Sequence, residues 1–267
     1  MSDGATGLAG VDVAAELALA LELADTADAI TLPPFLARDV AVDRKANDTE
    51  VTALDRAAES AIASRLAADR PHHRLLGEEF GTAGDATSPW LWIVDPIDGT
   101  SGYVRGIPVW ATLIALAHAD HGVVVGVVSA PALGRRWWAS AGGGTFADGR
   151  RCRVSDVAAV ADAQVSVTLN DGWDELGLTP ALVRLAMDAR RSRGFGDFWQ
   201  HALVAEGALD VAVDAVGVAA YDVAAVRLLV EEAGGTFTDL HGVVTHDTGT
   251  AISTNGVLHA EVLRRLS

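Results

Sequence analysis

The residues whose types and spacing point most clearly to chemistry are Asp95 and Asp98, which follow an apolar run and precede a glycine turn at 99–101. The run at 91–94 is apolar without alternation, as in a strand buried on both faces, so Asp95 stands where the chain leaves that cover. We expect Pro96 to end the strand, and a helix that opens at 99–101 to turn free N–H groups toward an anion. Two carboxylates beside such an anion cradle suit Mg²⁺ bridged to a phosphate. Asp-Pro and Asp-Gly are also common turn formers, so an ordinary turn is the alternative.

A second acidic cluster nearby favours the metal site over the ordinary turn. Glu78 and Glu79 follow Gly77 at the end of another short apolar run, at 75–76. Two such runs can be strands of one sheet, and their ends then meet at the same edge. We therefore expect Glu78 to lie close to Asp95.

Three segments resemble, in the same order, the signatures of the inositol monophosphatase family of Mg²⁺-dependent phosphatases. They are Gly77-Glu78-Glu79, Asp95-Pro96-Ile97-Asp98-Gly99-Thr100 and Tyr221-Asp222-Val223-Ala224-Ala225. The resemblance extends over about residues 45–255, and the segments 105–111, 128–133, 135–138 and 196–198 are most similar to actinobacterial histidinol-phosphate phosphatases. It implies an α/β layered fold, the α-β-α-β-α sandwich of this family, usually as a homodimer.

The resemblance also implies a site with two or three Mg²⁺ ions, for which Mn²⁺ can substitute. The ligands that it implies are Glu78, Asp95, the carbonyl of Ile97, Asp98 and Asp222. Asp95 would be shared by two ions, Glu78 would also reach a third, and Glu79 would support the ligands from behind. The eight histidines form no His-x-x-x-His pair and no tight cluster with cysteine, so an all-oxygen site for Mg²⁺ or Mn²⁺ is favoured over zinc.

The resemblance assigns the reaction itself to residues around the same turn. Asp55 and Thr100 would activate a water molecule, and the substrate would lie near Asp197 and Asp214. The N–H groups implied to receive the phosphate are those of Gly99, Thr100 and Ser101. Histidinol carries an ammonium and an imidazole that carboxylates can pair with, whereas inositol is a neutral polyol. We therefore expect hydrolysis of histidinol phosphate, with inositol 1-phosphate as the alternative substrate.

Several of these acids have ordinary structural interpretations, which the sequence leaves open. Asp55 could be a surface acid in a first helical turn, and Asp214 a surface acid at a strand end. Asp197 and Asp222 could be helix N-caps. Two departures from the family pattern, Tyr221 and Gly102, remove no ligand. A non-catalytic ion-binding scaffold is the alternative of another class, but no ligand of the set is missing.

Composition limits the class of protein and its partners. The chain has 267 residues, half of them hydrophobic, which suffices for one large domain or two coupled ones. A net charge of −16 and a pI near 4.7 disfavour nucleic acid and anionic membrane surfaces as partners. The single cysteine fits a reducing compartment, and no apolar run reaches the roughly 20 residues of a membrane helix. We expect a cytoplasmic protein that binds a small phosphate monoester.

The elements that must position these residues follow from periodicity. Apolar spacing predicts a helix at 11–32 that ends at Pro33-Pro34, and Thr52 is expected to cap a second helix reaching about Ala68. The runs at 109–117 and 123–130 predict a hairpin. A polar segment at 153–161 divides the chain into an N-terminal half, 1–155, and a C-terminal half, 156–267, where αβ alternation includes a helix at 180–191.

Overall fold

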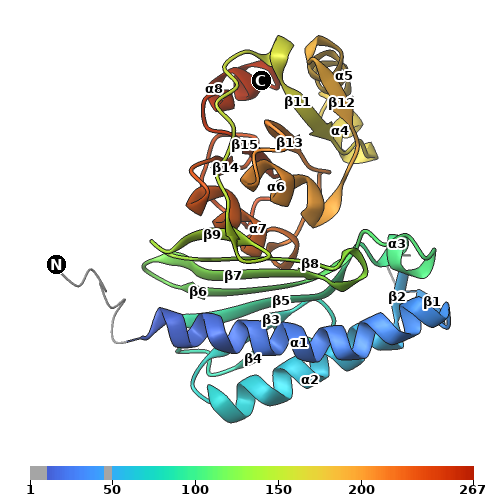
Figure 1. Ribbon diagram of the computed structural model, residues 1–267, viewed down its shortest axis with the longest axis vertical. Helices are drawn as coiled ribbons and strands as arrows, with labels where there is room; N and C mark the ends of the chain where they lie inside the picture. The colour runs from blue at the N-terminus through green and yellow to red at the C-terminus, as the bar shows by residue number, and fades with distance from the viewer. Residues whose placement is uncertain (1–10, 45–49) are drawn as a thin grey trace.

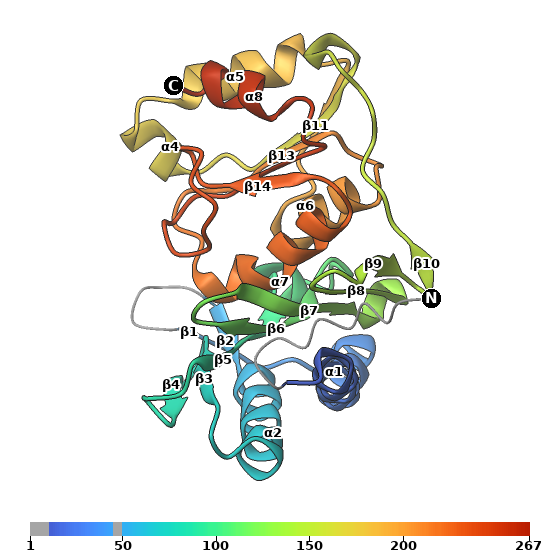
Figure 2. The ribbon, with the colours of Figure 1, turned by 90° about the vertical axis from the view of Figure 1, so that its left-hand side faces the viewer.

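The computed structural model describes residues 11–44 and 50–267, and its elements stack in five layers along the long axis (Figure 1). Helices, an eight-stranded sheet, helices, a five-stranded sheet and helices follow one another, as the second view also shows (Figure 2). The helices of the three layers are α1 (Val13–Ala37) and α2 (Ala53–Asp69), then α6 (Asp197–Ala205) and α7 (Ala220–Glu232), then α5 (Thr179–Asp188) and α8 (His259–Arg265). The predicted α-β-α-β-α sandwich is confirmed.

The eight-stranded sheet brings the two predicted acidic segments together, at the C-terminal ends of two neighbouring strands. Its strands, in spatial order, are β10 (Arg150–Arg151), β9 (Gly144–Ala147), β8 (Arg135–Ser140), β7 (Gly122–Ala130), β6 (Ala111–His118), β5 (Trp90–Asp98), β3 (Arg74–Gly77) and β4 (Gly81–Gly84). β3 runs parallel to β5, with Gly77 opposite Val94, while the other neighbouring strands are antiparallel. Glu78 and Asp95 are therefore the next residues on two adjacent strands, as expected.

Pro96 does not end the strand, contrary to the prediction. β5 continues to Asp98, but its register with β6 shifts between Asp95 and Asp98. Proline cannot donate to a ladder hydrogen bond, and a bulge is one of the places in a sheet where this loss is tolerated. The Thr112 hydroxyl on β6 donates to the Pro96 carbonyl at 2.9 Å. The bulge thus places both aspartates at the end of a continuous strand.

The prediction that Pro33-Pro34 ends the first helix is also wrong. α1 continues to Ala37, and Arg38 closes it in the left-handed conformation. Two prolines remove two helical N–H donors, so tertiary contacts must hold the last turn. Phe35 packs against Tyr103 and Trp110 at ring-centroid distances of 5.5 and 5.4 Å, and the Tyr103 hydroxyl donates to the Thr31 carbonyl at 2.7 Å.

The five-stranded sheet is the fourth layer, and it packs on the side of α6 and α7 that faces away from the eight-stranded sheet (Figure 1). Its spatial order is β12 (Arg191–Arg193), β11 (Gln164–Val167), β13 (Val211–Val213), β15 (Ile252–Thr254) and β14 (Thr236–Thr238). The helix expected at 180–191 ends at Asp188, because the residues after it pair in parallel with β11 as an edge strand. Shorter elements are β1 (Val42–Arg44), β2 (Glu50–Thr52), α3 (Thr100–Val104) and α4 (Asp171–Glu175).

The main core lies between the eight-stranded sheet and the middle helices. Val223 and Leu229 of α7 and Phe198 of α6 are buried there with Ile93 of β5. α7 belongs to the predicted C-terminal half but packs on the sheet of the N-terminal half. A division of the chain at residue 155 stays a prediction. Among the described residues, no helix has both the length and the apolar character of a membrane span.

Candidate active site

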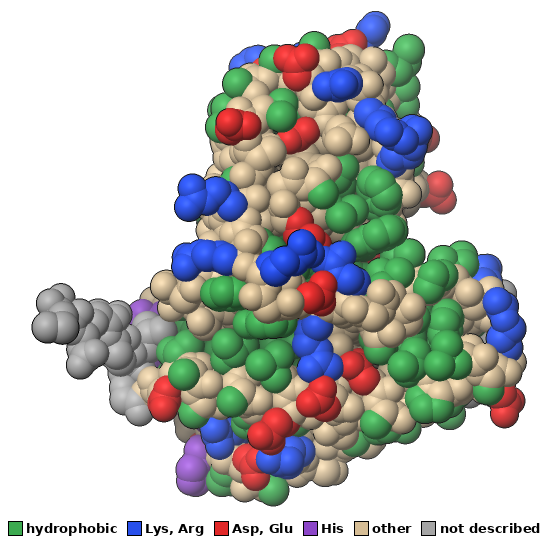
Figure 3. Space-filling view, in the orientation of Figure 1, with side chains coloured by type: hydrophobic (Ala, Val, Ile, Leu, Met, Phe, Trp, Pro, Cys, Tyr) green, Lys and Arg blue, Asp and Glu red, His purple; other side chains and the backbone are tan. Residues whose placement is uncertain are grey.

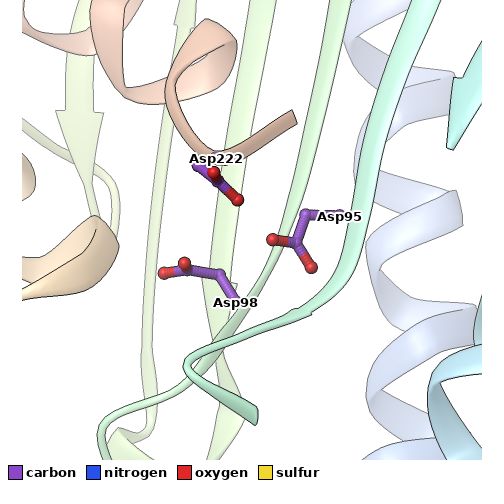
Figure 4. Close-up of side chains that lie close together, drawn as sticks. All are labelled: Asp95, Asp98 and Asp222. Carbon is purple, nitrogen blue, oxygen red and sulfur yellow. The ribbon is translucent and has the colours of Figure 1, made fainter. Parts of the chain in front are cut away.

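Three aspartates meet where the bulge of β5 faces the start of α7. Each of Asp95, Asp98 and Asp222 offers a carboxylate oxygen, and these oxygens all lie within 4.8 Å of one another (Figure 4). The first two come from β5, and Asp222 lies in the first turn of α7. Among the described residues, no other group of three or more His, Cys, Asp or Glu has this spacing.

Each aspartate keeps its place through a backbone hydrogen bond. The Ile97 N–H donates to Asp95 Oδ1 at 3.0 Å, and the Phe198 N–H donates to Asp98 Oδ2 at 2.8 Å. The Ala219 N–H donates to Asp222 Oδ2 at 2.6 Å. Asp222 is therefore not the N-cap that the sequence left open, although one of its oxygens satisfies the N-terminus of α7. Each aspartate also offers one oxygen to the group that could hold a metal ion.

The electrostatics of this cluster favour a bound cation. Burial raises the pKa of Asp95 and of Asp98 well above the usual range. Nearby carboxylates raise both further, with Glu78 the strongest of them on Asp95 and Asp197 the strongest on Asp98. Burial also raises the pKa of Asp222 to about 7. None of these three carboxylates forms an ion pair with a described Lys or Arg side chain. A hard divalent cation with oxygen ligands fits this donor set.

Glu78 and Glu79 occupy the three-residue loop between β3 and β4. The Glu78 N–H donates to the Val94 carbonyl at 3.2 Å, and its negative charge raises the pKa of both Asp95 and Asp222. Its carboxylate is not part of the group of oxygens within 4.8 Å. The Glu79 side chain is almost fully buried and lies 4.0 Å from the Arg56 guanidinium on α2. Glu78 thus lies beside the aspartates, and Glu79 contacts the helix behind them.

Asp55 and Thr100 are paired, as the resemblance implied. The Thr100 hydroxyl lies 3.3 Å from Asp55 Oδ1 and donates to the Ile97 carbonyl at 2.8 Å. A hydroxyl carries one proton, so these two donations are alternatives. Asp55 is fully buried and accepts from the N–H and hydroxyl of Thr52, which excludes the surface-acid interpretation. Burial raises its pKa.

The turn that follows Asp98 has the shape expected of an anion cradle. Gly99 has a φ of 81°, and a Cβ there would lie 3.0 Å from the Val109 carbonyl oxygen, so only glycine fits well. α3 begins at Thr100, and its first intrahelical bond joins the Tyr103 N–H to the Gly99 carbonyl. The N–H groups of Thr100 and Ser101 are consequently free of helical partners.

Asp197 lies at the rim of the same turn. Its Oδ2 would be 3.3 Å from a Cβ on Gly99, and desolvation followed by the nearby Asp214 carboxylate raises its pKa to about 6. Asp197 is the first residue of α6 rather than its N-cap, and its φ is 47°. Such a left-handed conformation is uncommon outside glycine and is concentrated at functional sites.

Asp214 is not the surface acid that its strand-end position allowed. It is only 5% exposed and accepts from His201 Nε2 at 2.9 Å and from the Ala215 N–H at 2.8 Å. His201 Nδ1 lies 2.7 Å from the Ser253 hydroxyl. The carboxylate still raises the pKa of Asp197, so the two side chains lie near each other.

Two buried residues of this region were missed in the sequence. Glu59 lies one helical turn after Asp55 on α2, and its carboxylate accepts backbone N–H bonds from the loop that carries Glu78. His201 lies one turn after Asp197 on α6. The signal that could have found both was the i, i+4 spacing from an acid already selected, which places two side chains on one helix face.

The comparisons with known proteins agree with this geometry. The model of the inositol monophosphatase family matches residues 12–267. The histidinol-phosphatase of Mycobacterium tuberculosis is 49% identical over 257 residues, covering 94% of this chain and 98% of that protein. The histidinol-phosphatase of Streptomyces coelicolor is 45% identical over 260 residues, covering 94% and 97%.

A solved structure gives the same result for the fold. The extragenic suppressor protein suhB from Bartonella henselae superposes with a TM-score of 0.87 at 28% identity, covering 95% of this chain and 98% of that one. The phosphatase class and the fold expected from the sequence are thereby confirmed. The chain belongs to the inositol monophosphatase family.

Proposed function

We propose that the protein hydrolyses histidinol phosphate to histidinol and phosphate with the help of two or three Mg²⁺ ions, which Mn²⁺ can replace. The observation that carries the proposal is the convergence of Asp95, Asp98 and Asp222 beside the glycine turn. Asp95 and the Ile97 carbonyl, with Glu78, would hold one ion, and the three aspartates another. Bound Mg²⁺ supplies positive charge that makes water more acidic and offsets the charge of the phosphate.

The chain's own groups orient the reactants. The Thr100 hydroxyl, paired with Asp55, would position the attacking water. The buried Asp55 carboxylate would accept a proton, because a raised pKa makes it a stronger base. The N–H groups of Gly99, Thr100 and Ser101 would receive the phosphate oxygens. Asp95 and Asp98 are held by backbone hydrogen bonds, so they would keep the bound ions in place, without rearrangement, as charge develops on the phosphate.

The choice of substrate rests on the acids at the rim. Asp197 Oδ2 lies close to Gly99 of the phosphate turn and would attract the ammonium or imidazole of histidinol, and the buried Asp214 nearby would add negative charge. Relatives of high identity over nearly the whole chain carry the name histidinol-phosphatase. The test is the ratio of kcat/KM for L-histidinol phosphate to that for myo-inositol 1-phosphate, which we expect to be well above one. A ratio below one would assign the site to inositol phosphate instead.

We also propose that the protein acts in the cytoplasm as a homodimer. Large hydrophobic side chains are exposed at Leu36, Phe80 and Ile107, and hydrophobic side chains gather on parts of the surface drawn in Figure 3. Contiguous patches of such side chains often mark contact surfaces between protein chains. Sedimentation equilibrium at several concentrations would measure the mass, and a monomer throughout would exclude the dimer.

A further inference from the structure

The loop that carries Glu78 is held by a carboxylate that the proposed mechanism does not use. Glu59 of α2 is fully buried, and its Oε2 accepts the Glu79 N–H at 2.8 Å while its Oε1 accepts the Phe80 N–H at 3.0 Å. The third N–H of the loop, that of Glu78, donates to the Val94 carbonyl. Every amide of the loop therefore has a defined acceptor, and Glu59 supplies two of them.

The side chains of the loop differ in burial: that of Glu79 is almost fully buried beside Arg56, whereas that of Phe80 is not. The Phe80 side chain is 58% exposed, so the loop gains little from its burial. Both oxygens of Glu59 are directed at backbone N–H groups, which makes it a support of the loop rather than an ion ligand. Gly77 is part of the same arrangement, since a Cβ at Gly77 would clash with the Glu59 carboxylate.

α2 thereby connects the two sides of the site. Asp55, in its first turn, contacts Thr100 after β5, and Glu59, one turn later, holds the loop after β3. Residues four apart project from the same side of a helix. A single rigid element thus sets the distance between the Asp55–Thr100 pair and Glu78.

We propose that Glu59 is a positioning residue that fixes Glu78 beside Asp95 and thereby sets the affinity of the site for its divalent ions. The inference rests on the proposed metal-dependent function. Groups that orient metal ligands change metal affinity by about 10- to 100-fold when they are removed. A residue that contributes only to folding would change stability and leave metal affinity alone.

The chain offers a matched control in Glu16. This glutamate is also buried in a helix of the first layer and also accepts bonds through both oxygens, from Arg70 Nε at 2.8 and 3.0 Å. Glu16→Gln and Glu59→Gln both keep the side-chain length and remove one buried carboxylate. Glu16 has no contact with the loop or the aspartates among its hydrogen bonds in the described chain.

The experiment measures Mn²⁺ binding by electron paramagnetic resonance, and hydrogen exchange of the Glu79 and Phe80 amides in the metal-free protein. Glu59→Gln should weaken Mn²⁺ binding by about 10-fold or more and speed the exchange of these amides, because a side-chain amide can accept only one of the two bonds. Glu16→Gln should change neither. Wild-type Mn²⁺ affinity in Glu59→Gln, or an equal loss in Glu16→Gln, would overturn the proposal.

Gly77→Ala separates position from charge. Gly77 has no left-handed φ, so alanine acts there through its Cβ, which would displace the Glu59 carboxylate without neutralising it. We expect the same weaker Mn²⁺ binding, and this variant also decides the question if Glu59→Gln does not fold. A loss confined to Glu59→Gln would mean that the charge of Glu59 matters and not its position, and would overturn the positioning role. If the wild type bound no Mn²⁺ and Asp95→Asn made no difference, the proposed function itself would be wrong.

Discussion

Asp197→Asn removes a carboxylate that lies close to Gly99 of the phosphate turn while keeping the size of the side chain. Its Oδ2 is close to Gly99, and its left-handed backbone, which asparagine also tolerates, need not change. The substitution should therefore leave the fold and the metal ligands in place. Its effect should fall on substrates whose leaving group carries a positive charge.

The magnitude follows from a charged hydrogen bond at an exposed position. Such a bond contributes about 1.5–3 kcal/mol, and each 1.4 kcal/mol corresponds to roughly a factor of ten. Asp197 is exposed as a residue although the surrounding protein raises the pKa of its carboxyl, so solvent reaches the side chain and the lower end of this range applies. We expect kcat/KM for histidinol phosphate to fall by about 10-fold, and that for β-glycerophosphate, whose leaving alcohol is uncharged, to change by less than about twofold.

Phosphate release from both substrates, measured at the same Mg²⁺ concentration, gives for each substrate the ratio of the variant's kcat/KM to that of the wild type. Asp120→Asn is the control, since Asp120 is an exposed acid in the hairpin between β6 and β7, at the opposite end of β6 from the site. Asp120→Asn should leave kcat/KM for both substrates at the wild-type value. Equal losses on the two substrates in Asp197→Asn would refute the assignment of Asp197 to the substrate's cation.

Three further predictions concern the metal and the water. Thr100→Val should lower kcat by about 100-fold or more with little change in KM, since the lost hydroxyl acts on water and not on substrate binding. Steady-state kinetics would measure both constants, and a change in KM instead of kcat would contradict this role. The folded-state pKa of Asp222 is raised to about 7 from 3.8, so the folded protein binds more protons than the unfolded chain between these values. The metal-free protein should consequently lose stability as the pH rises through this window, and saturating Mg²⁺ should restore it; a Tm that rises with pH in EDTA would contradict this sign. LiCl should inhibit more strongly than NaCl at equal concentration, because a small cation can replace one Mg²⁺ in an oxygen site; equal inhibition would indicate ionic screening alone.

The site could be predicted from the sequence where neighbouring residues in the chain determined its parts. The acids Glu78 and Asp95 each follow a short apolar run, and the parallel pairing of β3 with β5 brings them together. Asp222 opens a helix and lies against β5, as its place in the third signature implied. The layered fold followed from αβ alternation, because sheets and helices must bury their apolar faces against one another.

Long-range contacts explain what the sequence could not give. Pro33-Pro34 reads as a helix end, but packing of Phe35 against Tyr103 and Trp110 outweighs the two lost hydrogen bonds. Glu59 reads as one more charge on an amphipathic helix, and only the fold shows that backbone amides some 20 residues away satisfy it. Tertiary context overrides local propensity at such positions.

The most direct test of the account is phosphate release from L-histidinol phosphate as a function of Mg²⁺, with the wild type and Asp95→Asn compared at equal folded concentration. We predict release that saturates with Mg²⁺, stops in EDTA and returns when Mg²⁺ is restored. Asp95→Asn, which loses the carboxylate proposed to be shared by two ions, should show no turnover while keeping a folded-state circular dichroism spectrum. Release that persists in EDTA, or wild-type turnover in Asp95→Asn, would contradict the central claim that the aspartate cluster performs metal-dependent hydrolysis.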